Sequence, residues 1–112
     1  MAVHENLHNQ NQYVDAVISL YLKTPDTPQK PSYNDRITAS NFFAQRIPLQ
    51  TIEAALMLAS LRRLSRQDDQ PPLSPVRSLA YFVPVIQEIS VAPLPDEYIQ
   101  YLRLKLLSVS AR

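Results

Sequence analysis

The sequence predicts an all-α protein, a compact bundle of about five helices. Apolar residues recur at helical spacing along most of the chain, and no stretch shows sustained apolar–polar alternation or a glycine-containing hairpin turn. The chain has ten prolines and no glycine, and prolines separate the helical stretches. Its 112 residues suit one domain that folds without disulfides or a metal.

The first predicted helix spans residues 11–23. Residues 1–10 are polar, and we expect them to be a flexible segment ahead of a single helical domain at residues 11–109. The helix carries one apolar stripe, made of Val14, Val17, Ile18, Tyr21 and Leu22. Three prolines within residues 24–31 then end it.

A second helix is expected to begin after Ser32 or Asn34, since either residue can cap it. It ends at Arg46, because Pro48 disfavours helical geometry at Ile47. Two sets of residues form its expected apolar side: Ile37, Ser40, Asn41 and Ala44, widened by Ala39, Phe42, Phe43 and Ile47.

The third helix lies in the stretch of residues 46–64 and is apolar on nearly every side, with Pro48 in its first turn. Its apolar positions are Leu49, Ile52, Ala55, Leu56, Met57, Leu58, Ala59 and Leu61. Such a helix is expected at the centre of the bundle. Helices two and three can also form a helix-turn-helix pair, although the turn lacks the usual glycine.

Two more helices are predicted in the C-terminal part. Ser74 and Pro75 form a cap-and-proline start signal for the fourth. Pro84 lies inside its pattern and is expected to kink or divide it near residues 80–83. The inward residues are Val76, Leu79, Phe82, Val83, Ile86 and Ile89. Asp96 and Glu97 open the fifth helix, whose stripe is Tyr98, Ile99, Leu102, Leu106 and Val109.

Composition excludes several classes of protein. Without cysteine there are no disulfides, thiolate zinc sites or cysteine nucleophiles. Without glycine there is no glycine-rich phosphate-binding loop. The longest apolar run is far below the ~20 residues of a membrane helix, and the polar start has no signal-peptide core. We expect a soluble cytoplasmic protein with no membrane contact and no cofactor.

Candidate catalytic groups are weak. His4 and His8 have a metal-compatible spacing, but no third ligand is near. The carboxylates at 68–69 are expected in a solvated loop, and Glu53 and Glu88 have no partner visible in the sequence. No Ser-His-Asp set has a supporting spacing, so we do not expect an enzyme.

Basic residues give the main candidate site. The candidate nucleic-acid-binding residues are Arg62, Arg63, Arg66, Arg77, Arg103 and Lys105. Arginine suits bidentate contacts to phosphate. An alternative remains open, in which the arginines near residue 62 complement the dipole at the end of a helix.

The order of elements in residues 34–90 resembles the C-terminal module of DnaD-like primosomal and plasmid or phage replication-initiation proteins. That module carries a Tyr-x-x-x-Ile-x-x-x-Trp pattern, which is matched here by Tyr81, Val85 and Ile89. The resemblance implies DNA binding, partly through the helix with this pattern and the tail after it.

Two functions are therefore considered. The first is a small nucleic-acid-binding accessory protein of a replication or mobile-element system. The second is a helical protein–protein adaptor, a small subunit of a larger complex or a homo-oligomer with no nucleic-acid role. The net charge of only +1 and the six tyrosines favour the second.

Overall fold

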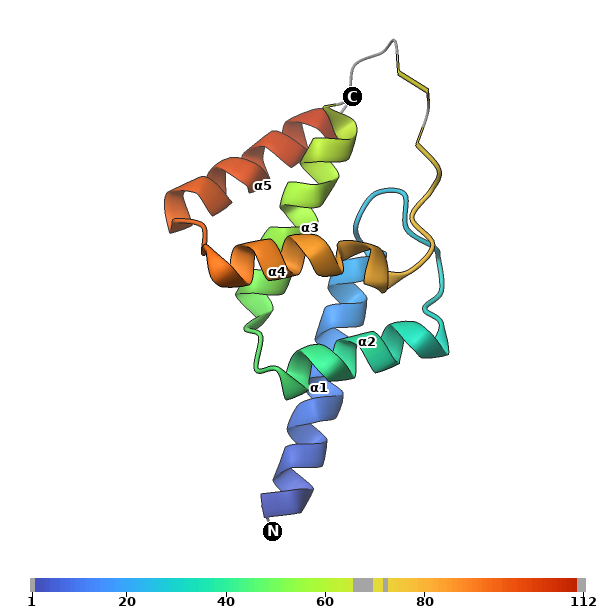
Figure 1. The fold of residues 1–112 in the computed structure, drawn as a ribbon, viewed down its shortest axis with the longest axis vertical. Coiled ribbons are helices and arrows are strands. Elements are labelled where there is room, and N and C mark those ends of the chain that lie inside the picture. Colours follow the sequence, from blue (N-terminus) through green and yellow to red (C-terminus); the bar gives the residue numbers. More distant parts are fainter. Residues whose placement is uncertain (1, 66–69, 72, 111–112) are drawn as a thin grey trace.

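The computed structural model describes residues 2–65, 70–71 and 73–110, with side chains from residue 9 to residue 108 within those ranges. The elements in chain order are α1 (Ala2–Leu22), α2 (Tyr33–Ala44), α3 (Leu49–Leu64), the 3-10 helix η1 (Leu79–Phe82), α4 (Val83–Val91) and α5 (Asp96–Ser110). Figure 1 shows the α-helices gathered into a compact body, from which the start of α1 projects. The predicted all-α bundle of about five helices is confirmed for the described residues.

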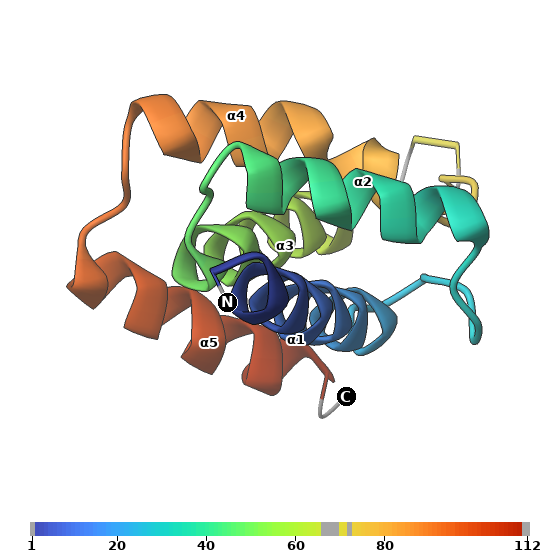
Figure 2. The ribbon, with the colours of Figure 1, turned by 90° about the horizontal axis from the view of Figure 1, so that it is seen from below.

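Helix α3 is the centre of the bundle. Viewed from below, it lies between α2 and α4 on one side and α1 and α5 on the other (Figure 2). Its buried residues are Ile52, Ala54, Ala55, Leu56, Leu58, Ala59 and Ser60. The alanines allow neighbouring helices to approach closely, and the prediction of a central helix is confirmed. The possible helix-turn-helix pair is not confirmed, because α2 packs mainly against α1 and α3 is buried among α1, α4 and α5.

Helix α1 begins at Ala2, whereas the sequence led us to start it at residue 11. The residues before residue 11 give no apolar stripe, but they extend a helix that the buried part of α1 has already formed, one hydrogen bond per residue. Farther along, the predicted stripe is confirmed: Val14, Val17, Ile18 and Tyr21 are buried, and Leu22 packs against the core.

Helix α2 begins where the sequence indicated. Ser32 is its N-cap and forms a capping box with Asp35, in which Ser32 Oγ accepts from the Asp35 N–H and Asp35 Oδ2 accepts from the Ser32 N–H. The predicted apolar side is partly wrong. Ile37 is exposed, whereas Ala39 and Phe42 face the core beside the buried Asp35.

Helix α2 ends at Ala44, and its last carbonyls are satisfied by a Schellman motif. The Ile47 N–H donates to the Phe42 carbonyl over 3.1 Å, and the Arg46 N–H donates to the Phe43 carbonyl over 2.9 Å. This motif needs a left-handed residue, which is usually glycine. Here Arg46 takes that conformation with a φ of 59°.

The predicted helix start at Ser74–Pro75 is wrong. Residues 73–78 are not helical, because their backbone donors are bonded elsewhere. The Val76 N–H donates to the Asp26 carbonyl over 2.9 Å, and the Leu79 N–H donates to Asp35 Oδ1 over 2.9 Å. The predicted break near Pro84 is confirmed, since η1 ends at Phe82 and α4 begins at Val83.

Helix α5 packs along α3. Leu102 is fully buried and Ile99 packs against the core, as the stripe predicted. Tyr98, which the stripe placed inward, is 40% exposed, and the side chain of Val109 lies outside the described residues. No helix among the described residues has the length and apolar character needed to cross a bilayer.

Candidate nucleic-acid interface

Arg62 bridges α3 and α4. It stands in the last turn of α3, and its Nη1 and Nη2 donate to Glu88 Oε1 and Oε2 over 3.0 and 2.7 Å. The hydrogen bond from Arg62 lowers the pKa of Glu88. Both side chains are about half exposed. A guanidinium has five N–H donors, so the bidentate pair leaves other donors of Arg62 for an outside acceptor.

Arg63, the next residue, is held almost entirely inside the protein. Its side chain is 9% exposed. Its Nη1 donates to the Tyr81 hydroxyl over 3.0 Å, and its Nη2 donates to the Ser74 carbonyl over 2.9 Å and to Asp26 Oδ2 over 3.4 Å. Arg63 therefore joins the end of α3 to residues 73–78 and to the loop after α1.

Tyr81 forms an aromatic wall beside these arginines. The Arg63 guanidinium carbon lies 5.3 Å from the centroid of the Tyr81 ring, within the range of a cation–π contact. The ring of Phe82 packs against Tyr81 edge-on at 5.1 Å. Tyr81 is nevertheless 46% exposed, so part of its ring surface is open to solvent.

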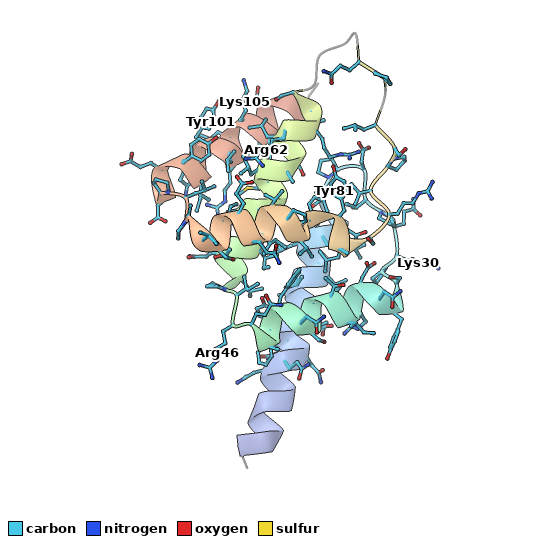
Figure 3. All side chains as sticks on the ribbon, viewed as in Figure 1. Lys30, Arg46, Arg62, Tyr81, Tyr101 and Lys105 are labelled. Carbon is cyan, nitrogen blue, oxygen red and sulfur yellow. The ribbon has the colours of Figure 1, made fainter. Side chains whose placement is uncertain are left out.

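These side chains line a groove between α3 and the η1–α4 segment, with a volume of about 380 Å³. It is lined by Ala59, Arg62, Arg63, Leu73, Tyr81 and Val85. We call this the α3–α4 groove. Figure 3 shows Arg62 and Tyr81 in the upper half of the view, whereas Lys30 lies at the right edge and Arg46 at the lower left.

The other predicted site residues are not gathered at this groove. Arg77 is exposed in the segment before η1 and forms no ion pair with a described residue. Arg103 of α5 is paired with Glu53 of α3. Lys105 is exposed on α5, and Arg66 lies outside the described residues.

Sequence reasoning missed the acidic partners. Glu53 and Glu88, which it treated as lone carboxylates, each bind an arginine from the predicted site. Glu53 follows the buried Ile52 and Glu88 precedes the buried Ile89, on helices predicted to pack together, and this was the available signal. The carboxylates at 68–69 and the side chains of His4 and His8 lie outside the described residues. Among the described residues, no group of three or more His, Cys, Asp or Glu could hold a metal ion.

Comparison with protein-family models, curated proteins and solved structures finds no match for this chain. The resemblance to the DnaD-like module stays an expectation drawn from the sequence pattern.

Proposed function

We propose that this chain is a small nucleic-acid-binding accessory protein and that it binds an unpaired base in the α3–α4 groove. The observation that carries the proposal is the Tyr81 ring, which is half exposed, contacts Arg63 and lines the same groove as Arg62. Aromatic rings beside cations bind single-stranded nucleic acid because every base has a face that can stack. A replication or mobile-element context is supported by the resemblance of residues 34–90 alone.

The groove offers the two interactions that a single-stranded ligand needs, a stacking surface for a base and a hydrogen-bond donor for a phosphate. Tyr81, together with Ala59 and Val85 of the groove lining, offers an apolar surface for a base. Arg62 is half exposed and keeps unused N–H donors for a phosphate oxygen. Because Glu88 and Asp26 neutralise the arginines, we expect modest affinity and a small number of phosphate contacts.

A helical protein–protein adaptor is the second candidate. The exposed Leu104 and Leu107 of α5 favour it, since neighbouring exposed leucines commonly mark a protein contact.

The test of the nucleic-acid proposal is a fluorescence-anisotropy titration. Single-stranded and double-stranded oligonucleotides of about 12 nucleotides are compared at about 50 and about 200 mM salt. We expect binding to the single strand that weakens as salt rises. Absence of binding to either form at the lower salt would contradict the proposal.

Tyr81→Leu tests the aromatic wall. Loss of base stacking should weaken single-strand binding by about tenfold. Tyr33→Leu is the matched control, because Tyr33 is a 79% exposed tyrosine on α2 and does not line the groove. Equal affinities of the two variants would exclude stacking on Tyr81.

A further inference from the structure

Helix α5 is held on one side only. It packs along α3 through Leu102 and Ile99, and it lies at the lower edge of the molecule in Figure 2, with no described element below it. Its opposite side is therefore open to a partner.

The outward side of α5 is partly apolar. Residues 97, 101, 104 and 108 follow a spacing of four, three and four, which places them along one stripe of a helix. At about 100° per residue this stripe lies opposite Ile99, Leu102 and Leu106. Tyr101 and Leu104, in the middle of the stripe, are 50% and 67% exposed. We call residues 97, 101, 104, 105 and 108 the outer face of α5.

Two opposite charges stand near the ends of the outer face. Glu97 lies in the first turn of α5 and Lys105 two turns later, and both are exposed. Neither forms an ion pair with a described residue. Eight residues of helix separate them by about 12 Å, so they cannot bind each other within one chain.

We propose that the outer face of α5 binds the same face of a second copy of this chain in an antiparallel, two-fold arrangement. The charges decide the direction. A parallel pair would place Glu97 beside Glu97 and Lys105 beside Lys105, whereas an antiparallel pair brings each Glu97 near the other copy's Lys105. The same arrangement packs each Tyr101 against the other copy's Leu104.

Such a dimer gives Lys105 a role different from the phosphate contact predicted from the sequence. It does not depend on the proposed nucleic-acid function, because the residues that line the α3–α4 groove lie outside α5. A contact made by one helix pair is at the small end of protein interfaces, so we expect a dissociation constant of roughly 10 to 100 µM.

Sedimentation velocity between about 5 and about 500 µM protein covers this range. We expect the wild-type chain to shift from monomer to dimer. Leu104→Glu should remain monomeric, because it places two carboxylates in the apolar middle of the contact. Lys30→Gln is the charge-matched control, because it lowers the net charge by as much as Leu104→Glu does and Lys30 is exposed far from α5 (Figure 3). It should dimerise like the wild type.

The charge swap tests the direction of pairing. Glu97→Lys and Lys105→Glu should each weaken dimerisation by about fivefold or more, because each places like charges together twice in the symmetric pair. The double variant should regain most of the wild-type affinity. Glu97, Leu104 and Lys105 are all exposed, and circular dichroism checks that the variants fold. Any one of three results would overturn the proposal. The wild-type chain could stay monomeric at every concentration, the Leu104→Glu variant could still dimerise, or the double variant could dimerise no better than the single variants.

Discussion

Asp35 and Leu79 lie 44 residues apart in the sequence and are joined by a hydrogen bond, in which the Leu79 N–H donates to Asp35 Oδ1 over 2.9 Å. The other carboxylate oxygen of Asp35 accepts from the Ser32 N–H over 2.9 Å. Asp35 is 1% exposed. One buried side chain thus caps α2 and also fixes the backbone where η1 begins.

Asp35→Ala should lower the free energy of unfolding by about 2–4 kcal/mol, because the buried Leu79 N–H and the part-buried Ser32 N–H both lose their acceptor. Asp35→Asn keeps one acceptor oxygen and should cost less. Ser32→Ala removes only the other half of the capping box and should cost about 1 kcal/mol. Urea unfolding measures all three. An Asp35→Ala variant as stable as the wild type would show that the bond to Leu79 contributes nothing.

Arg46→Gly should raise the free energy of unfolding by about 0.5–1 kcal/mol. Arg46 sits at a φ of 59°, where a side chain is disfavoured and glycine is not. Arg46→Ala removes the charge but keeps the Cβ atom, so it should leave stability nearly unchanged. An Arg46→Gly variant less stable than Arg46→Ala would contradict a left-handed conformation at residue 46.

Tyr21→Phe should not destabilise the protein at neutral pH and should stabilise it by up to about 1 kcal/mol. The Tyr21 hydroxyl is buried and has no hydrogen-bond partner among the described residues, so removing it relieves an uncompensated desolvation. A loss above about 1 kcal/mol on urea unfolding would mean that the hydroxyl has a partner.

The same variant changes the response to alkaline pH. Burial, with a smaller effect of Asp35, raises the pKa of Tyr21 from 10.0 to about 12. Above pH 10 the unfolded chain loses this proton more readily than the folded chain, so stability falls as pH rises toward 12. Tyr21→Phe should show a shallower fall in stability between about pH 10 and about pH 12. Burial also raises the pKa of Tyr13 to about 12, which leaves a residual slope in both proteins.

The parts of the fold that follow local rules could be predicted from the sequence. The stripe of α1 and the central place of α3 are direct results of helical periodicity and apolar content. Ile37 is exposed because it is the only large apolar residue among Ile37, Ser40, Asn41 and Ala44. The side of α2 that carries Phe42 buries more apolar surface, so that side packs against the core. The start at Ser74–Pro75 was wrong because tertiary hydrogen bonds to Asp26 and Asp35 outweigh a local capping signal.

The candidate site was predicted only in part, for the same physical reason. The density of arginines near residue 62 is visible in the sequence, but their partners come from other elements. Glu88 lies 26 residues from Arg62, and Tyr81 lies 18 residues from Arg63. Only the packing of α4 and η1 on α3 brings these residues together and leaves Arg62 more exposed than Arg63.

The most direct test of the account is the salt dependence of single-strand binding in Arg62→Gln and Glu88→Gln. If Arg62 contacts phosphate, Arg62→Gln weakens binding and reduces the slope of log affinity against log salt by about 0.7. Glu88→Gln removes the competing carboxylate and should strengthen binding. Affinities and slopes equal to the wild type in both variants would contradict a phosphate contact at Arg62 and leave it as a structural bridge between α3 and α4.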